Sequence, residues 1–289
     1  MDAPLVLKAP AKINLHLSIG ALRADGYHDV DTVMQTLELA DMMTLTFGHE
    51  GGFELACEPP VDVPAEQNLV WKAAHRLAEA LGLEPDSALS GIHVLVKKHI
   101  PAQGGLGGGS SDAATTIRAL CLHWGVNPLS EEALSVARSL GADVAFFLYG
   151  GCVLLSGRGD EYVCSLPTAS APVVLVKPEG GVSTGEAYRS FDAAPSAESL
   201  PAPEAYVTVA DAHDLAPLLF NNLAPAVYTL RPDIAELAAW LQAAPGTCGT
   251  LLSGSGATVF ALCESDEAAA RIANEAAARG FWALATRLG

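Results

Sequence analysis

A glycine-rich run spans residues 101–112 and reads Pro-Ala-Gln-Gly-Gly-Leu-Gly-Gly-Gly-Ser-Ser-Asp. Five of the six residues in Gly104–Gly109 are glycine, so the backbone can approach an anion closely and adopt positive φ angles. The apolar residues that follow, Ala113, Ile117 and Leu120, recur at helical spacing. A glycine loop that opens a helix offers unpaired backbone N–H groups and the positive end of the helix dipole. The run therefore predicts a site for a phosphorylated ligand, most simply a nucleotide.

Two familiar phosphate-binding patterns fit this run poorly. No Gly-Lys-Ser or Gly-Lys-Thr follows the glycines, as a P-loop would require. Residues 92–98 predict a strand before the run, but no convincing acidic residue for a ribose lies on a second strand about 20 residues further on. A flexible surface loop is the plainer alternative. Ser110, Ser111 and Asp112 weigh against it, because these residue types cap helices, and we expect them to cap the helix that follows.

A second set of polar residues lies on a strand predicted over residues 10–19. Apolar and polar residues alternate there, which predicts a half-buried strand with Lys12 and Asn14 on its polar face. That face could simply be solvated. Asp143 precedes an apolar stretch, so its carboxylate could be a helix N-cap or a proton acceptor at the edge of a buried element. A lysine beside such a carboxylate would hold it ionised.

Composition narrows the class of protein. The chain has 289 residues, of which 50% are hydrophobic and 17% charged, as expected for one large or two ordinary domains. The net charge of −17 argues against nucleic acid or an anionic membrane as a partner. No apolar run long enough to span a membrane and no signal sequence is evident, which predicts a cytoplasmic protein. The six cysteines form no Cys-x-x-Cys pair and are expected to be buried, reduced thiols.

The rest of the chain predicts interleaved strands and helices without a regular β-α-β rhythm, which favours an α+β fold. Strands are expected at 33–39, 43–47, 92–98, 152–156, 173–177 and 281–288, with a strand pair over 249–263. Helices are expected at 69–81, after Ser130, at 233–243, and from Ser265 to Gly280.

Three segments together resemble the motifs of the GHMP kinases, the galactokinase, homoserine kinase and mevalonate kinase superfamily. They are Pro10–Leu15, the run at 101–112 and Leu252–Leu262, and their order and spacing extend over nearly the whole chain. The start at Pro10, together with Arg23–His28 and Leu140–Val144, resembles more closely the family that phosphorylates 4-diphosphocytidyl-2-C-methyl-D-erythritol. This resemblance implies transfer of the ATP γ-phosphoryl group to the 2-hydroxyl of the methylerythritol unit, a step of non-mevalonate isoprenoid biosynthesis.

The resemblance also implies roles for residues at the acceptor. Asp143 is expected to be the catalytic base and Lys12 to lie beside the acceptor, where it would lower the pKa of the acceptor hydroxyl. Asn14 shares the strand face of Lys12 and is expected to hydrogen-bond the acceptor.

The resemblance implies that four further residues recognise the cytosine of the acceptor. Tyr27 offers a stacking face, and His28 offers ring nitrogens to the edge of the base. Thr184 and Tyr188 resemble the second wall of that pocket, although this part of the resemblance is looser.

On the nucleotide side, the resemblance implies ATP as co-substrate with Mg²⁺. The residues expected to bind ATP are Pro101, Ala102, Gln103, Gly104, Gly105, Leu106, Gly107, Gly108, Gly109, Ser110, Ser111, Asn68 and Lys98. Ser110 or Ser111 is expected to reach Mg²⁺, and Asn68 and Lys98 to contact adenine and ribose. The loop Ser253–Gly256 is expected to support the glycine run. The chain departs from the family at Ala102-Gln103-Gly104, where Gly-Ala-Gly is common.

The superfamily architecture implies two domains. A ribosomal-S5-type, ATP-binding domain is expected over residues 1–160 and a ferredoxin-like domain over 161–289, with the active site in the cleft between them. Another GHMP kinase activity and a catalytically silent nucleotide-binding module are the alternatives. The Asp-Gly-Tyr-His loop argues against the first, and the presence of both Lys12 and Asp143 against the second. The sequence predicts a small-molecule partner. It does not show the metal ligands in detail or the oligomeric state.

Overall fold

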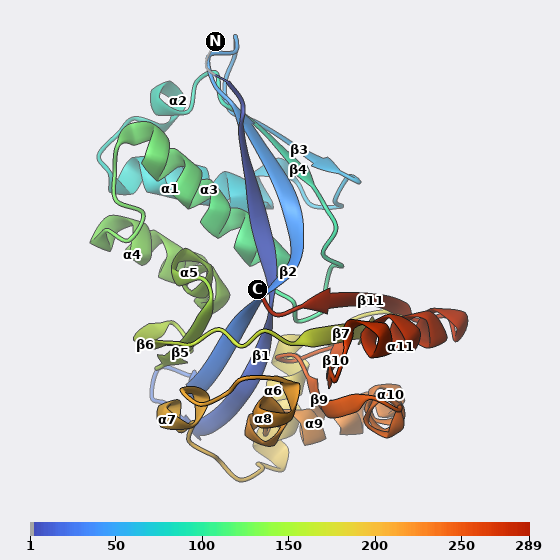
Figure 1. Ribbon diagram of the computed structural model, residues 1–289. Helices are drawn as coiled ribbons and strands as arrows, with labels where there is room; N and C mark the ends of the chain where they lie inside the picture. The colour runs from blue at the N-terminus through green and yellow to red at the C-terminus, as the bar shows by residue number, and fades with distance from the viewer. Residues whose placement is uncertain (1–2) are drawn as a thin grey trace. The chain divides into compact units, whose positions relative to one another are not determined.

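The computed structural model describes residues 3–289, and the chain divides into two compact units (Figure 1). The first unit contains the described residues up to Ala11, Leu39–Ala102 and Gly107–Gly150. The second contains Lys12–Glu38, Gln103–Leu106 and Gly151–Gly289. The α+β class is as expected, whereas the domain boundary at residues 160 and 161 stays a prediction.

The first unit combines short strands with most of the N-terminal helices. Its strands are the beginning of β1 (Leu5–Leu22), the end of β2 (His28–Thr46), β3 (Glu54–Glu58) and β4 (His93–Lys97). Its helices are the 3-10 helix η1 (Ala65–Gln67), α1 (Leu69–Ala80), α2 (Pro85–Ala88), α3 (Gly108–Trp124), α4 (Glu131–Leu140) and α5 (Ala142–Tyr149). Strand β4 pairs antiparallel with the end of β2 and parallel with β3, and α3 packs beside α1 (Figure 1).

The second unit contains the rest of β1 and β2 and all later elements. Its further strands are β5 (Cys152–Ser156), β6 (Glu161–Leu166), β7 (Pro172–Lys177), β8 (Phe220–Asn221), β9 (Thr247–Leu252), β10 (Val259–Cys263) and β11 (Trp282–Arg287). Its helices are α6 (Thr184–Ala193), α7 (Pro203–Tyr206), α8 (Ala212–Leu215), η2 (Ala216–Leu218), α9 (Ala224–Leu230), α10 (Pro232–Ala243) and α11 (Asp266–Ala278). An antiparallel sheet has the order β11-β7-β10-β9, and apolar residues of this sheet, α10 and α11 share one core.

Strand β1 is buried on both faces, so the prediction of a half-buried strand was wrong. The polar residues Lys12, Asn14, His16 and Ser18 are only 2% to 4% exposed. Burial of polar groups is tolerated when they are hydrogen-bonded. The His16 ring bonds to the carbonyl of Ser199 at 2.6 Å, and Ser18 Oγ accepts from the Ser199 N–H at 3.1 Å. Alternation in the sequence could not reveal this second cover, because the segment that supplies it lies far away in the chain.

Helix boundaries set by local residues were mostly predicted correctly. Ser130 caps α4 and Ser265 caps α11, each accepting from the N–H three residues on. The cap of α3 was predicted wrongly. This helix begins at Gly108 with Gly107 at the N-cap and no side-chain cap bond. Ser110, Ser111 and Asp112 therefore lie inside the first turns, because the helix starts within the glycines.

Two other expectations need adjustment. The strands predicted at 33–39 and 43–47 form the single strand β2. Three of the six cysteines are half-buried rather than buried, namely Cys57, Cys164 and Cys248. Across residues 3–289, no helix is both long enough and apolar enough to cross a membrane.

Candidate active site

The glycine run connects the end of β4 to α3. Gly105 and Gly107 both have φ of 72°, a left-handed conformation that favours glycine. A Cβ on Gly105 would lie 2.2 Å from the Ser253 carbonyl oxygen, so a side chain has no room there. Gln103 has φ of 52°, which is uncommon for a residue with a side chain. The unusual Ala102-Gln103-Gly104 sequence is thus accommodated by a left-handed glutamine.

The loop between β9 and β10 supports the glycine run, as predicted. Ser253 Oγ donates to the Gly105 carbonyl at 2.9 Å, and the Thr258 N–H donates to the Gly104 carbonyl at 3.2 Å. The Asn221 side-chain amide donates to two main-chain carbonyls of the β9–β10 connection, each at 2.9 Å. These contacts, all within the second unit, hold the middle of the run in one conformation.

The start of α3 presents polar groups suited to an anion. The first intrahelical bond described runs from the Ser111 N–H to the Gly107 carbonyl at 2.8 Å. The amides of the preceding residues belong to the unsatisfied first turn of a helix, where the dipole favours negative charge. Ser111 is fully buried, and its hydroxyl has no hydrogen-bond partner among residues 3–289.

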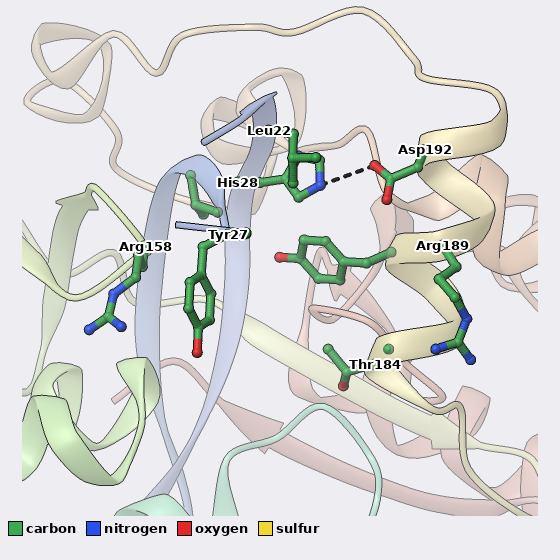
Figure 2. A pocket seen from close by; sticks show the side chains of 11 residues that line it. Leu22, Tyr27, His28, Arg158, Thr184, Arg189 and Asp192 are labelled. Carbon is green, nitrogen blue, oxygen red and sulfur yellow. Dashed lines mark ion pairs between the residues drawn. The ribbon is translucent and has the colours of Figure 1, made fainter. Parts of the chain in front are cut away.

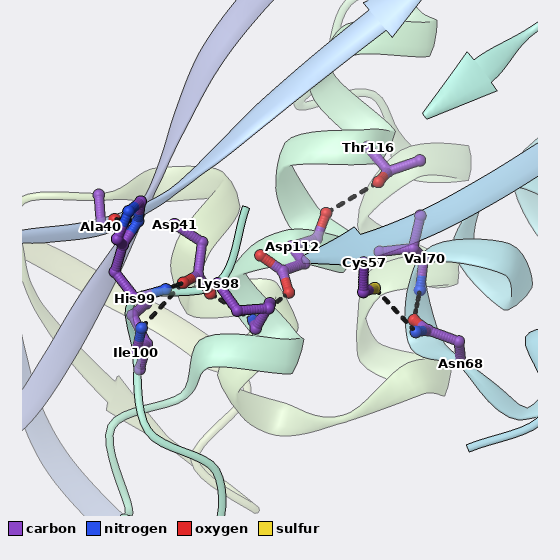
Figure 3. Close-up of polar contacts among 10 residues, drawn as sticks. All are labelled: Ala40, Asp41, Cys57, Asn68, Val70, Lys98, His99, Ile100, Asp112 and Thr116. Atoms are coloured by element: carbon purple, nitrogen blue, oxygen red, sulfur yellow. Dashed lines mark hydrogen bonds and ion pairs between the residues drawn. The ribbon is translucent and has the colours of Figure 1, made fainter. Parts of the chain in front are cut away.

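Lys98 lies between two carboxylates, and we call Asp41, Lys98 and Asp112 the Lys98 cluster (Figure 3). The ammonium Nζ donates to Asp41 Oδ2 and to Asp112 Oδ2, the latter at 2.5 Å. Asp41 Oδ1 accepts from the backbone N–H groups of His99 and Ile100. Two of the three N–H donors of Lys98 are thereby directed at carboxylates.

Burial and charge shift the titration of the Lys98 cluster. Burial raises the pKa of Asp112 to about 7, with Lys98 opposing the rise and Asp41 adding to it. For Lys98, burial acts to lower the pKa, but the two carboxylates outweigh it and hold that pKa above its usual value. The pKa of Asp112 is thus raised chiefly by burial, and that of Lys98 by the two carboxylates that its ammonium contacts.

Asn68, which was predicted together with Lys98 to contact adenine and ribose, caps α1. Its Oδ1 accepts from the Val70 N–H at 2.9 Å. Its Nδ2 lies 4.0 Å from Cys57 Sγ (Figure 3). The side chain therefore has a structural role at the helix start, and its predicted contact with adenine stays a prediction.

Lys12 and Asn14 lie together on β1 in the second unit. Lys12 Nζ donates to Asn14 Oδ1 at 2.7 Å, and Asn14 Nδ2 donates to Thr32 Oγ1 at 2.9 Å. The Lys12 backbone N–H donates to the carbonyl of Leu106, in the glycine run, at 3.0 Å. A Cβ on Gly254 would lie 3.5 Å from Lys12 Nζ. The structure thus places Lys12, which was predicted to lie beside the acceptor, against the glycine run and the loop that supports it.

Asp143 is the second residue of α5 in the first unit. The helix follows Gly141, whose φ is 156°, and no side chain caps it. The N-cap alternative for Asp143 is therefore wrong, since the residue is inside the first turn, where a carboxylate is stabilised by the helix dipole. Its side chain is half-buried. Its predicted pairing with Lys12, which belongs to the other unit, stays a prediction.

Tyr27, His28, Thr184 and Tyr188 line one cavity of about 460 Å³ in the second unit (Figure 2). Tyr27 is 55% exposed, and the guanidinium of Arg158 lies 5.2 Å from the centroid of its ring. Thr184 Oγ1 lies 2.9 Å from Ser255 Oγ. The four residues predicted to surround cytosine are therefore neighbours in space, although the chain between them is long.

His28 forms the buried part of this cavity. Its Nδ1 lies 2.9 Å from the Gly20 carbonyl oxygen and its Nε2 lies 3.0 Å from Asp192 Oδ1. Figure 2 shows the His28 and Asp192 side chains directed at each other. The ring is 5.5 Å from that of Tyr188, in a tilted arrangement. Both ring nitrogens have partners in the protein, so a base edge would have to replace one of them or use the main chain.

Comparison with known proteins identifies the family. Residues 68–151 match the family model for the GHMP kinases N terminal domain. Residues 205–281 match the family model described as GHMP kinases C terminal. A 4-diphosphocytidyl-2-C-methyl-D-erythritol kinase of Desulfitobacterium hafniense (strain Y51) is 40% identical over 268 residues, 92% of this chain and 89% of that protein. The chain belongs to this GHMP kinase family. It is accordingly an ATP-dependent kinase of a small molecule.

Solved structures agree with this assignment. A crystal structure of 4-(cytidine 5'-diphospho)-2C-methyl-D-erythritol kinase is 33% identical, with a TM-score of 0.80 and 99% of each chain covered. Homoserine kinase from Cytophaga hutchinsonii ATCC 33406 is 22% identical with a TM-score of 0.74, covering 100% of this chain and 95% of that one. The second likeness concerns the fold alone. Together they confirm the α+β GHMP kinase fold that the motifs predicted.

Several charged residues around the sites of this GHMP kinase were not predicted from the sequence. They are Asp41, Arg158, Arg189 and Asp192, and Asp112 was expected only as a cap. None of them belongs to a local pattern that signals a site. The small number of basic residues, 16 Lys and Arg in the whole chain, was the available signal, because few cations can serve an anionic ligand.

Proposed function

We propose that the chain transfers the γ-phosphoryl group of ATP to the 2-hydroxyl of 4-diphosphocytidyl-2-C-methyl-D-erythritol, giving the 2-phosphate and ADP in non-mevalonate isoprenoid precursor biosynthesis. The observation that carries the proposal is the assembly of Tyr27, His28, Thr184 and Tyr188 around one cavity. The chain also aligns over 92% of its length with a kinase named for that substrate. A cavity with aromatic walls and a few polar groups suits a nucleoside.

In this proposal Asp143 and Lys12 act on the acceptor. Asp143 accepts the proton of the 2-hydroxyl, whose oxygen forms a bond to the γ-phosphorus while the bond from phosphorus to the ADP oxygen breaks. Lys12 places its charge beside that oxygen and stabilises its negative form. Asn14, which accepts a hydrogen bond from Lys12 at 2.7 Å, orients the lysine and contacts the acceptor.

The cavity holds the cytidine end of the acceptor. Tyr27 and Tyr188 contribute aromatic faces, and Thr184 contributes a hydroxyl at the rim. His28, fixed through Gly20 and Asp192, defines the depth to which a base can enter. Arg158 and Arg189 add positive charge to the lining, which suits an acceptor that carries a diphosphate.

The glycine run and the start of α3 hold the phosphates of ATP. Backbone amides from Gly104 to Ser110 provide the donors, whereas the Ser111 amide, also expected to do so, already donates to the Gly107 carbonyl. The buried Ser111 hydroxyl, without a partner among the described residues, fits a ligand of Mg²⁺, which prefers oxygen ligands and binds with substrate phosphates. When bound, the ion neutralises charge on the phosphates. Asn68 and Lys98 are assigned to the adenosine end of the nucleotide.

We expect the protein to act on a small molecule in the cytoplasm. A nucleic acid or an anionic membrane is not an expected partner, because a net charge of −17 repels polyanionic surfaces.

The test is a coupled ADP-release assay with Mg-ATP and four acceptors. These are 4-diphosphocytidyl-2-C-methyl-D-erythritol, the same polyol phosphate without cytidine, homoserine and mevalonate. Turnover with the cytidylated acceptor alone is the expected result. Turnover with homoserine or mevalonate instead would keep the fold and overturn the substrate. ATP binding without turnover on any acceptor would indicate a catalytically silent module.

A further inference from the structure

The Lys98 cluster joins three segments of the first unit. Asp41 belongs to β2, Lys98 follows the end of β4, and Asp112 lies near the start of α3. The ammonium of Lys98, just before the glycine run, thus links the last residue of the run, Asp112 on α3, with Asp41 on β2 (Figure 3).

A second set of contacts joins the same segments without Lys98. Asp41 Oδ1 accepts from the N–H of Ile100 at 2.8 Å, just before the glycine run. Gly108, the first residue of α3, lies against this point. A Cβ on Gly108 would be 3.0 Å from Ile100 Cγ2 and 3.6 Å from Asp41 Oδ2. The entry and the exit of the run therefore meet at the Asp41 carboxylate, and a larger residue at 108 would separate them.

The cluster sets two acids against one ammonium, so its charges do not balance when both acids are ionised. Asp41 is 0% exposed and Asp112 is 4% exposed, and the two share one ammonium. Asp112 Oδ1 has no hydrogen-bond partner among residues 3–289. Burying ions costs free energy that their attraction does not always repay, and apolar replacements are often at least as stabilising. The Lys98 cluster is therefore better explained by the backbone geometry that it imposes on the glycine run than by a contribution to the stability of the fold.

We propose that Asp41 and Asp112 are positioning residues for ATP binding, because together with Lys98 they fix the two ends of the glycine run at the spacing that its phosphate-binding amides require. The proposal rests on the nucleotide role assigned to the run above. Glycine loses more conformational freedom on ordering than any other residue. A run with five glycines whose ends are already fixed therefore loses less entropy when it closes around phosphates, and binds them more tightly.

The experiment compares nucleotide and acceptor parameters in matched variants. In Asp41→Asn the amide oxygen can still accept from His99 and Ile100, but the charge that pairs with Lys98 is gone. We expect the Kd for ADP, measured by calorimetry, and the KM for ATP to rise about tenfold or more, while the KM for the acceptor stays within about twofold. Glu79→Gln, the same chemical change at an exposed position of α1, should leave every parameter unchanged.

Asp112→Asn provides a second, milder test, because the pair of Asp41 and Lys98 remains. We expect a smaller rise in the nucleotide Kd than in Asp41→Asn. It also keeps the proposal testable if Asp41→Asn does not fold. An unchanged nucleotide Kd in the folded variants, or an equal rise in both KM values, would overturn the proposal and leave the cluster a structural feature only.

Failure of the positioning proposal can be distinguished from failure of the proposed reaction. The ratio of nucleotide Kd values between variant and wild type tests the positioning role. Turnover of the wild type on the cytidylated acceptor tests the reaction, and either result can fail without the other.

Discussion

Both the Lys98 cluster and the pocket around His28 place a basic side chain beside carboxylate oxygens, but the carboxylates differ in burial. The side chains of Asp41 and Asp112 are 0% and 6% exposed. In the pocket, the side chain of His28 is 7% exposed, but that of its partner Asp192 is 46% exposed. Buried charges are held by the packing around them, and removal of one partner of a buried pair strongly lowers the stability of the fold. A half-exposed carboxylate such as that of Asp192 is screened by solvent, so its contact contributes little to stability and can rearrange around a ligand.

This difference suggests a division of labour within the kinase. In the two proposals above, the buried cluster fixes the backbone geometry that binds the phosphates of ATP, and the pocket holds the side chains that recognise the acceptor. Changes in the cluster should therefore affect folding and nucleotide affinity, whereas changes in the pocket should affect acceptor affinity alone.

Asp143→Asn should have the largest effect and lies outside both regions. Removal of the proposed base should lower kcat by about 10²- to 10⁴-fold, the range for loss of a general base. The Kd for ATP should stay close to that of the wild type, because the amide keeps the shape of the side chain. Single-turnover measurements with saturating substrates would check this, and preserved turnover would remove Asp143 from the mechanism.

Lys98→Met should be the most destabilising change in the cluster. It leaves two buried carboxylates without their ammonium, a kind of change that costs about 3 to 5 kcal/mol. Urea unfolding at pH 7 would measure the loss, and Lys72→Met on α1, a half-buried lysine, is the control.

The pH dependence of the stability of Lys98→Met tests whether the loss of stability is electrostatic. The pKa of Asp112 is raised to about 7 in the folded protein, so its contribution to stability is present at low pH and lost as pH rises through that value. Without Lys98 the pKa should rise further. The deficit of Lys98→Met should therefore shrink as pH falls from 7 towards 5, and a deficit that stays constant would contradict the electrostatic explanation.

Gly105→Ala should test the middle of the run, which neither region contains. The new Cβ would lie 2.2 Å from the Ser253 carbonyl, at a residue with φ of 72°. Backbone strain and overpacking together should cost about 2 kcal/mol or more in the free energy of unfolding. Gly109→Ala is the matched control, since its nearest contact would be Leu69 Cδ1 at 3.8 Å. Equal stability of the two variants would show that the support from Ser253 is weak.

Asp192→Asn should have the smallest effect. His28 keeps its contact with the Gly20 carbonyl and loses a half-exposed charged partner. We expect the KM for the cytidylated acceptor to rise by about tenfold at most, with the melting temperature and the KM for ATP unchanged. Steady-state kinetics and thermal unfolding would check this. A large loss of stability would mean that the pocket is as rigid as the cluster, and the contrast between the two regions would fail.

The sequence by itself determined features that depend on near neighbours. The ends of α1, α4 and α11 were predictable from Gly82, Ser130 and Ser265, because caps act over a few residues. The sequence of the glycine run predicted that a helix follows it, although the first residue of that helix, Gly108, was not predicted. The family was evident from three motifs, since each is a continuous segment whose residue types carry the signal.

Tertiary structure alone decided which side chains are buried together. Lys98 meets Asp41 from 57 positions away, and His28 meets Asp192 from 164 positions away. The polar face of β1 is buried because distant segments cover it, which alternation cannot reveal. Caps and turns depend on the few residues beside them. Burial, ion pairing and shifted pKa values depend on what the folded chain brings close, and no local pattern records that.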